Sequence, residues 1–449
     1  MQITIVGGGS YQWTPELLAD LLGTESLHGA HYVLEDIDPV PLEKMSRLAG
    51  LLNESMGAGA TVSATTDQRR ALEGSDFVIV TISTGGFDSM TFDLEVPARF
   101  GIRQSVGDTV GPGGINRSLR NIPVLVGVAE DMGKVCPDAW LLNITNPMTC
   151  LTRAVCRQTS IRAVGLCHEV GNWSIDLAIA LGKPMEAVRP TVAGVNHFPV
   201  VTALDVDGQD GFDIMAGMVE EAGGLAALAA GPRRPVAEEF SRLDFVQRHA
   251  LQLTMLDKWG AFPAAGDRHI AEFLPWVLTE SSGWGADFNL ELTSIGVRQG
   301  HQSGYIADVD AWLDGTKTLQ TWSSGELPAL VIDSLVTGER RELPANIPNA
   351  GQVPDVIADA VVESICVIDG DGIRGRDVAL LPQPYDELVR RHVAVAELTV
   401  AAAVGGDRSL AEAAFFLDPL AGRGDFHQTE TMVDELLSAT AAWLPAFAH

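Results

Sequence analysis

The sequence predicts an α/β protein, with an N-terminal doubly wound parallel sheet of the Rossmann type followed by a C-terminal α+β catalytic domain. Apolar, β-branched stretches alternate with helix-like stretches over about the first 170 residues, which indicates parallel strands connected by helices. The chain has 449 residues, more than one hydrophobic core usually serves. We therefore expect two domains, over residues 1–195 and 196–449.

Each predicted element follows from a local pattern. The stretch 76–83 is rich in Phe, Val and Ile, as expected of a strand buried on both faces. Pro15 suits the first turn of a helix, where its missing N–H is not needed. The predicted strands are 2–6, 31–38, 61–65, 76–83, 139–147 and 161–170, and the helices between them include 14–22, 42–55, 122–137 and 151–158. Later segments read as Ala-rich helix (216–260), mixed structure (281–310) and strand followed by long helices (352–415).

Composition excludes several classes of protein. Lys and Arg number 30 against 59 Asp and Glu, a net charge of −29, which disfavours nucleic acid and anionic membranes as partners. No apolar run reaches the roughly 20 residues needed to span a bilayer, and no charged leader precedes the first strand. Five cysteines without regular spacing make no disulfide framework. We expect a cytoplasmic enzyme.

The first strand runs directly into a glycine turn. Gly7 and Gly9 match the start of the dinucleotide fingerprint, although Gln12 stands where the third glycine would be. The first glycine permits the tight turn, and the second lets the backbone approach a pyrophosphate at the helix N-terminus. Asp36 follows the second strand, where a carboxylate would hold the ribose hydroxyls and disfavour a 2′-phosphate. A purely structural glycine turn would not explain this acid, so we predict NAD.

Polar residues gather at the ends of later strands. "SVGDTVGPGGINRSLRNIP" at 105–123 joins an acid to a Gly/Pro stretch and two arginines, and "NITNP" at 143–147 ends a strand with amides. "GLCHEV" at 165–170 and "GVNHF" at 194–198 add a thiol and two imidazoles. Such groups suit a divalent metal with open positions. Spacing alone leaves two alternatives: polar residues that line a cleft, and a catalytic Cys/His pair.

A last cluster, "WGAFPAAGDRHIAEFLPW" at 259–276, places charged groups between aromatic residues. An ionic surface helix would look the same. The glycine before Asp267 instead suggests a loop directed toward a site.

These motifs together resemble the family-4 glycoside hydrolases, which use NAD and a divalent metal and depart from the two-carboxylate rule of most glycosidases. The resemblance runs nearly end to end. It covers the opening glycine turn, the stretch at 107–114, the Asn-Pro at 146–147, the Cys-His at 167–168, the stretch at 194–197, the RHIAEFLPW stretch, and "NIPNAGQVPD" at 346–355.

The resemblance implies hydrolysis through transient oxidation. NAD accepts a hydride from C3 of the sugar, a base removes the C2 proton, the aglycone is eliminated, water adds, and the hydride returns. Mn²⁺ is the family's usual ion, and it acts as a Lewis acid. The implied residues fall into four roles. They are the cofactor-binding Gly7, Gly9, Ser10 and Asp36; the metal ligands Cys167 and His197; the catalytic Asp267, Asp108 and His168; and the substrate-binding Asn146, Asn196, Arg268, His269 and Arg117.

Several points stay open at this stage. Phosphoglycosidase members use a Tyr as the C2 base, and none of the four tyrosines here lies in the stretch around Asp267. Cys-His-Glu-Val resembles the subgroup acting on unphosphorylated α-glucosides, with close variants in α-galactosidases and α-glucuronidases. The family habit implies a homodimer or homotetramer. The competing hypotheses are an ordinary NAD-dependent 2-hydroxy acid dehydrogenase and a non-catalytic NAD-binding regulator.

Overall fold

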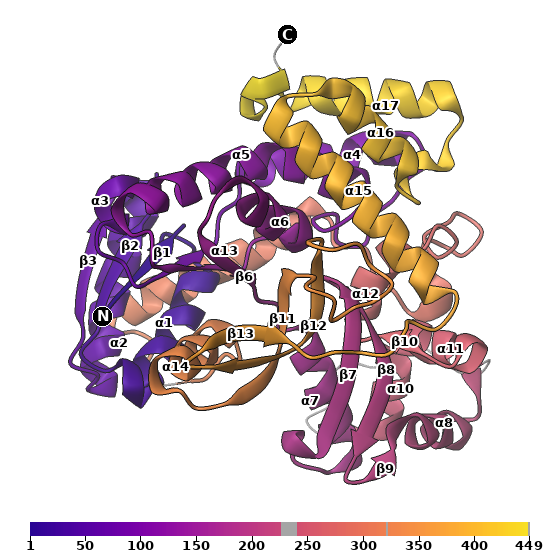
Figure 1. Cartoon of the computed structure of the whole chain (residues 1–449), viewed down its shortest axis with the longest axis horizontal. Coiled ribbons are helices and arrows are strands. Elements are labelled where there is room, and N and C mark those ends of the chain that lie inside the picture. The colour runs from indigo at the N-terminus through magenta and orange to yellow at the C-terminus, as the bar shows by residue number, and fades with distance from the viewer. Residues whose placement is uncertain (226–239, 320–321, 448–449) are drawn as a thin grey trace.

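A computed structural model describes residues 1–225, 240–319 and 322–447. Its parallel strands follow the order β3-β2-β1-β4-β5-β6, the doubly wound order of a dinucleotide-binding sheet. Their bounds are β1 (Gln2–Val6), β2 (His31–Glu35), β3 (Thr61–Thr65), β4 (Phe77–Val80), β5 (Trp140–Asn143) and β6 (Arg162–Gly165). Figure 1 shows β1, β2 and β3 at the indigo side of the molecule and β6 nearer its middle.

The sheet continues past β6 through antiparallel strands. Asn346 of β11 pairs with Gly165 of β6, and β12, β7, β8 and β10 follow in that order, with β13 on β12 and β9 on β8. Their bounds are β7 (Val188–Val195), β8 (Phe198–Val206), β9 (Gln209–Asp210), β10 (Phe262–Pro263), β11 (Arg341–Pro348), β12 (Val361–Asp369) and β13 (Gly372–Gly375). Thus β7 and β8 form a hairpin, and residue 195, the predicted domain boundary, is the last residue of β7. The division into domains at that residue stays a prediction.

Helices cover both faces of the parallel sheet. Alternate residues of a strand point to opposite faces. Ile79 accordingly packs with α1, α2 and α14, whereas Val78 and Val80 pack with α5, α6 and α15–α17. The helices of the first half are α1 (Trp13–Gly23), α2 (Pro39–Met56), α3 (Gln68–Leu72), α4 (Gly86–Arg99), α5 (Gly111–Val135), α6 (Met148–Gln158) and α7 (Glu169–Leu181).

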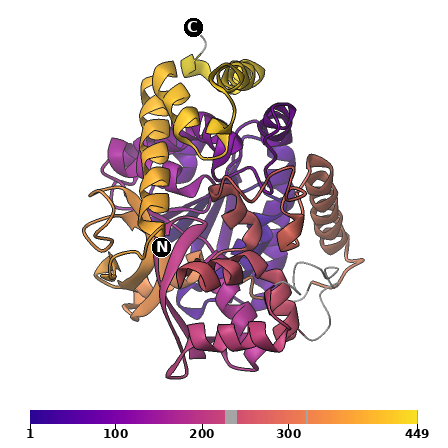
Figure 2. The ribbon, with the colours of Figure 1, turned by 90° about the vertical axis from the view of Figure 1, so that its right-hand side faces the viewer.

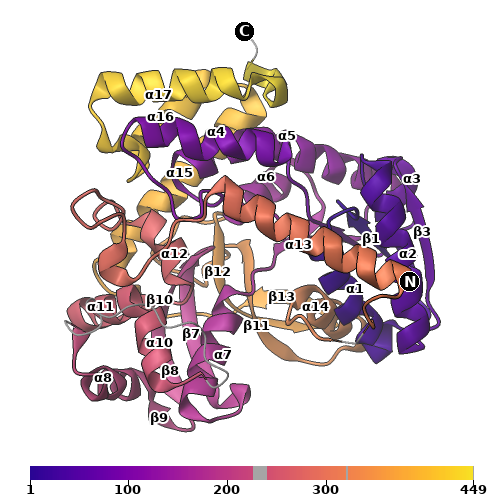
Figure 3. The same ribbon diagram turned by 180° about the vertical axis from the view of Figure 1, so that it is seen from behind.

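The C-terminal helices return to cover the first half of the chain. Figure 2 shows the long helix α15 standing beside the sheet, and Figure 3 shows α13 crossing the back of the molecule from α12 toward α2. These later helices are α8 (Gly211–Glu221), α10 (Arg242–Arg248), α11 (Ala250–Trp259), α12 (Asp267–Ile270), α13 (Ile295–Asp314), α14 (Leu327–Thr337), α15 (Tyr385–Gly405), α16 (Arg408–Leu417) and α17 (Phe426–Ala439). None of the helices in the described ranges is long and apolar enough to cross a bilayer.

The structure confirms the α/β class and corrects several element boundaries. The predicted strand 161–170 ends at Gly165, and Glu169 already begins α7. Sequence reasoning missed α4 and α7, and it predicted the Gly/Pro stretch at 107–114 as a loop ahead of a helix with two arginines, whereas α5 already begins at Gly111. Residues 226–239 of the predicted helical stretch 216–260 lie outside the described residues.

Glycines explain the early start of α5. A Cβ at Gly113 would lie 2.6 Å from the Gly107 carbonyl oxygen, and one at Gly114 would lie 2.5 Å from the Thr109 carbonyl carbon. Because only glycine lets the 107–110 turn fold back onto the helix, the Gly/Pro stretch belongs to its first turn.

Candidate active site

The glycine turn after β1 has the shape of a dinucleotide cradle. Gly7 has φ of 84°, and a Cβ there would lie 1.9 Å from the Thr81 carbonyl oxygen, so glycine is required. The Gly9 amide donates to Asp36 Oδ2 at 2.9 Å, which places the predicted ribose ligand beside the turn. Ser10 Oγ accepts from the Trp13 amide at 3.1 Å at the start of α1. The turn, the helix N-terminus and the acid therefore fit a dinucleotide.

The Cys-His pair follows the end of β6, next to this turn. Trp13, the first residue of α1, has its ring centroid 6.1 Å from that of His168. His168 Nδ1 bonds Glu326 Oε1 at 2.6 Å, and its Nε2 lies 3.5 Å from Glu169 Oε1. Burial opposes a charge on the ring, but the hydrogen bonds to Glu169 and Glu326 prevail and raise the pKa of His168 to about 10. His168 is therefore held in one orientation as a cation.

Cys167 is buried beside the hairpin formed by β7 and β8. Burial, Glu363 and Glu169 raise the pKa of the Cys167 thiol well above its usual range, while a hydrogen bond with Asn196 opposes that rise. A thiol in this environment becomes a thiolate only when a metal cation replaces its proton.

His197 lies in the turn between β7 and β8 with φ of 65°, an uncommon conformation for a residue other than glycine. Its Nδ1 lies 2.8 Å from Thr109 Oγ1, and its ring centroid lies 3.9 Å from that of His269. Burial and His269 lower the pKa of His197 to about 3. The imidazole is therefore neutral, as a metal ligand must be.

Asp108 lies at the entrance to α5 among cations. Burial raises its pKa, but Arg298 and Arg117 outweigh burial and hold the pKa of Asp108 below its ordinary value. Arg117 Nε also donates to the Asn146 carbonyl oxygen at 3.0 Å, and Arg298 donates to the Val106 carbonyl oxygen at 2.5 Å. Asp108 is consequently an ionised carboxylate next to the end of β5.

Two buried amides point to a missing ligand. Asn146 Oδ1 and Asn196 Oδ1 have no hydrogen-bond partner among the described residues, while Asn196 Nδ2 donates to Glu363 Oε2 at 3.3 Å. A buried polar atom without a partner costs about 1–3 kcal/mol. Hydroxyl groups of a sugar would satisfy both oxygens.

The cluster at 267–269 divides between two roles. His269 lies 3.9 Å through Nε2 from Glu169 Oε1 and contacts His197, so it belongs to the site. Arg268 donates to Thr293 Oγ1 at 2.6 Å. Both oxygens of Asp267 accept from amides at the start of α11, those of Leu251 at 2.7 Å and Gln252 at 3.2 Å. Asp267 is thus part of a helix cap, and its predicted role as acid/base stays a prediction.

The donor set fits a divalent cation with open positions. A buried thiol and a neutral imidazole are present, yet no three His, Cys, Asp or Glu side chains group to hold a metal within the described ranges. The remaining positions would be filled by substrate or water.

Sequence reasoning missed four residues around the site: Glu326 and Glu363, which are buried, and Glu169 and Arg298, which are partly buried. Glu363 lies in β12 opposite Gly194, and burial raises its pKa to about 8. One signal in the sequence could have identified Glu363. It is an acidic residue in the middle of the apolar stretch "VVESICVI" at 361–368. The other three are acids and an arginine in ordinary helical surroundings.

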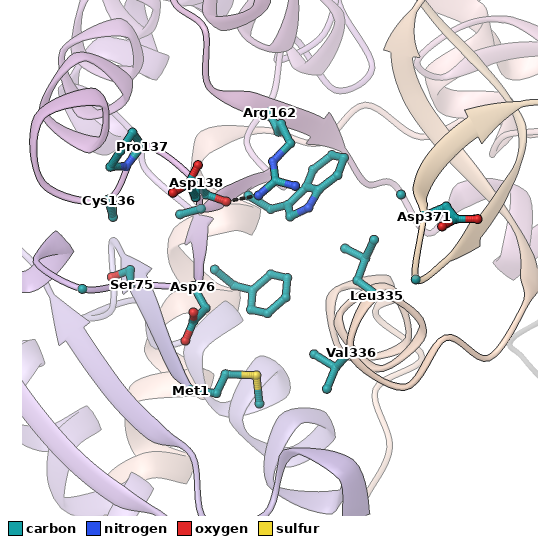
Figure 4. Close-up of a pocket in the computed structure, with 16 residues that line it drawn as sticks. Met1, Ser75, Asp76, Cys136, Pro137, Asp138, Arg162, Leu335, Val336 and Asp371 are labelled. Carbon is teal, nitrogen blue, oxygen red and sulfur yellow. Dashed lines mark hydrogen bonds between the residues drawn. The ribbon is translucent and has the colours of Figure 1, made fainter.

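A separate hollow of about 670 Å³ opens at the opposite edge of the sheet, where β4, β5 and β6 begin. Figure 4 shows Asp76, Arg162, Leu335, Val336 and Asp371 around it. The guanidinium of Arg162 lies 5.0 Å from the ring centroid of Trp140. Ligands of open α/β sheets bind at the carboxyl ends of the strands, so this hollow is remote from the chemistry.

Comparison with known proteins shows the family of the whole chain. The model of the family 4 glycosyl hydrolases matches residues 2–182, and that of their C-terminal domain matches residues 192–421. An α-galactosidase of Bacillus subtilis is 30% identical over 455 residues, 99% of each chain. An α-galacturonidase of Lachnoclostridium phytofermentans is 30% identical over 459 residues, 99% of this chain and 97% of the other.

Solved structures show the same architecture. The structure of lplD from Bacillus subtilis has a TM-score of 0.88 at 29% identity and covers 97% of this chain and 99% of that one. A 6-phospho-α-glucosidase from gut microorganisms, in complex with NAD and Mn²⁺, has a TM-score of 0.83 at 21% identity and covers 99% of both chains. The molecule is thus a glycosidase built on a dinucleotide-binding sheet. The chain belongs to glycosyl hydrolase family 4.

Proposed function

We propose that this chain hydrolyses unphosphorylated α-hexosides in a reaction that depends on NAD and on a divalent cation, with Mn²⁺ the first ion to test. One observation carries the proposal. The buried Cys167 thiol contacts Asn196, which precedes the neutral His197, and the ring of His168 lies 6.1 Å from that of Trp13 at the start of α1. When bound, NAD supplies a hydride acceptor, and the cation, held by Cys167 and His197, supplies a Lewis acid.

The residues of the chain would orient the sugar and exclude water. Asn146 and Asn196 would accept hydrogen bonds from sugar hydroxyls through their unpaired oxygens. Asp108 and Glu169 are ionised, since Arg298 and Arg117 hold the pKa of Asp108 low against burial, and His269 and the hydrogen bond from His168 do the same for Glu169. Either carboxylate could take a proton. Asp267, the predicted acid/base, would first have to release the two amides of α11.

The surroundings of His168 favour a neutral sugar. Two carboxylates, Glu169 and Glu326, already contact this cation, which leaves it poorly placed to bind a sugar phosphate. Relatives named as α-galactosidase and α-galacturonidase are equally identical to this chain. These identities do not separate the sugars, so we keep the ranking that the Cys-His-Glu-Val motif implies: α-glucosides first, with α-galactosides and uronides as the alternatives. Arg117 and Arg298, next to Asp108, would be the cations for a uronide. The homodimer or homotetramer and the cytoplasmic location stay predictions.

A panel of p-nitrophenyl glycosides tests the proposal. The panel holds α-glucoside, α-galactoside and α-galacturonide, their β-linked counterparts and 6-phosphoglucosides. We expect release of p-nitrophenol from an unphosphorylated α-glycoside only when NAD, Mn²⁺ and a reductant are all present. The proposal would be contradicted if enzyme stripped of nucleotide cleaved the glycosides at an undiminished rate in the presence of a chelator and without added NAD.

A further inference from the structure

Thr109 connects Asp108 to His197 through one hydroxyl group. Its Oγ1 lies 3.0 Å from Asp108 Oδ1 and 2.8 Å from His197 Nδ1. We infer that Thr109 is a positioning residue that fixes His197 in the tautomer protonated on Nδ1, which leaves the Nε2 lone pair for the divalent cation. The inference rests on the proposed function, because it takes His197 as a metal ligand.

The assignment of the proton follows from counting hydrogens. A threonine hydroxyl has one hydrogen to donate and can also accept. Asp108 lies near the guanidinium groups of Arg117 and Arg298. A carboxylate beside such cations is ionised, so it accepts hydrogen bonds and has no hydrogen to donate. The Thr109 hydrogen therefore points to Asp108. The hydroxyl oxygen must then accept from His197, whose Nδ1 carries the proton.

Both ends of this chain of hydrogen bonds are held by the fold. Glu272 Oε1 accepts the amides of Val106 at 2.7 Å and Gly107 at 2.8 Å, which anchors the turn just before Thr109. His197 lies in the tight turn between β7 and β8, with the ring of His269 next to its own. Thr109 is itself buried, at 7% exposed. The contact is thus a fixed feature of the interior.

A hydrogen bond to a histidine that binds a metal, such as that of Thr109 with His197, has a measurable effect on metal affinity. Partners that orient a ligating histidine set its tautomer and basicity, and their loss typically weakens metal binding about 10–100-fold. Valine has nearly the shape of threonine but lacks the hydroxyl, whereas serine keeps the hydroxyl. The pair Thr109→Val and Thr109→Ser therefore separates hydrogen bonding from packing.

The test is titration of the NAD-loaded full chain with Mn²⁺, followed by the loss of the free-ion signal in electron paramagnetic resonance. Thr109→Val is expected to raise the Mn²⁺ Kd about 10–100-fold, and Thr109→Ser to stay within about threefold of wild type. Thr429→Val is the matched control, because Thr429 is a buried threonine of α17 whose hydroxyl donates to the Ala421 carbonyl oxygen. It should bind as wild type does. An unchanged Kd in Thr109→Val would overturn the inference.

A second measurement works on wild-type protein alone, should Thr109→Val fail to fold. Nitrogen NMR of the apo chain labelled with ¹⁵N-histidine, with His197→Gln used for assignment, reports which ring nitrogen carries the proton. We expect a protonated Nδ1 and a bare Nε2 at neutral pH, and the reverse tautomer would refute the inference. Absence of Mn²⁺ binding by wild type would instead count against the proposed function, so the two failures are distinguishable.

Discussion

At the scale of single residues, nearby charges and hydrogen bonds decide which of the buried groups are charged. The site holds ionised Asp108 and Glu169 beside protonated His168 and neutral His197. These states follow from the neighbours of each group, which come from strands and helices far apart in the sequence. The same physics acts at Glu35, at the end of β2, where the carboxyl group is only 4% exposed.

Glu35 makes the stability of the protein depend on pH. Burial and the neighbouring Asp36 raise the pKa of Glu35 to about 7, from 4.5. Since the folded state prefers the protonated carboxyl, its contribution is complete below about pH 4.5 and is lost as the pH rises through about 7. Glu35→Gln should therefore exceed wild type in Tm by several degrees at pH 8 and little at pH 5.

Differential scanning calorimetry across this pH range checks the Glu35 prediction. Glu54→Gln is the control, because Glu54 is exposed and should leave the profile unchanged. Identical profiles for Glu35→Gln and wild type would refute the raised pKa.

Cys167 gives a second test at this scale. Cys167→Ser should reduce glycosidase activity by more than the ~10–100-fold typical of losing an outer contact of a metal ligand, because a serine hydroxyl replaces a soft thiolate. NAD affinity, measured by calorimetry, should be nearly unchanged. Cys156→Ser serves as the control, because Cys156 is a partly exposed cysteine of α6 and its loss should leave activity unchanged. A wild-type rate in Cys167→Ser after treatment with chelator would rule out the metal assignment.

At the scale of elements, strand ends and tight turns bring the chemistry together. β11 and β12 lie between β6 and the hairpin of β7 and β8. The turn of that hairpin nevertheless reaches the segments after β5 and β6, because Asn196 contacts Cys167 and its amide donates to Thr149 Oγ1 at 3.2 Å. A buried ion pair helps hold α4 against α5. Asp93 accepts from Arg120 and from Asn116 Nδ2, and both side chains of the ion pair are 0% exposed.

Breaking that ion pair should be costly. Asp93→Ala leaves a buried guanidinium without its partner, so we expect a loss of about 3–5 kcal/mol in the free energy of unfolding. Asp93→Leu combined with Arg120→Met should recover much of it. Glu221→Ala removes the exposed pair with Arg242 and should change stability by less than about 1 kcal/mol. Urea denaturation measures all three, and equal losses in the buried and exposed variants would contradict this account.

The sequence predicts the parts of the site that follow strands. The glycine turn, Asp36, Cys167 and His197 are visible because local patterns mark strand ends. Glu326 and Glu363 are not, since their importance comes from contacts with His168 and Asn196 across more than 150 positions of chain. The catalytic role of Asp267 is implied by the family resemblance and stays a prediction; local sequence gives no sign that its oxygens accept amides of α11. More of the fold than of the site could be predicted, because the hydrophobic pattern that marks strands and helices is visible in short stretches of sequence.

At the scale of the whole molecule, one continuous sheet carries both the nucleotide turn and the proposed metal ligands. The C-terminal helices α15–α17 pack on the first half, and α13 reaches back to α2, where Lys44 pairs with Asp310 at 2.5 Å. Binding of a dinucleotide should therefore stabilise the entire chain.

Thermal shift checks this stabilisation. At a concentration about 100-fold above Kd, NAD should add about 2.7 kcal/mol to the free energy of unfolding. NADP should add less, because Asp36 disfavours a 2′-phosphate. Asp36→Ala should reduce the rise in Tm that NAD causes. It should also narrow the difference between the rise with NAD and the rise with NADP. Equal shifts in wild type with NAD and NADP would contradict the role of Asp36.

The central claim is that the coenzyme site and the thiol–imidazole pair act on adjacent carbons of one sugar ring. Hydrolysis in D₂O tests it most directly, with the released hexose isolated and examined by proton NMR. The account predicts deuterium at C2, because a base of the chain removes the C2 proton before the aglycone leaves. A product that retains its full C2 proton signal would show direct displacement at C1 and contradict the account.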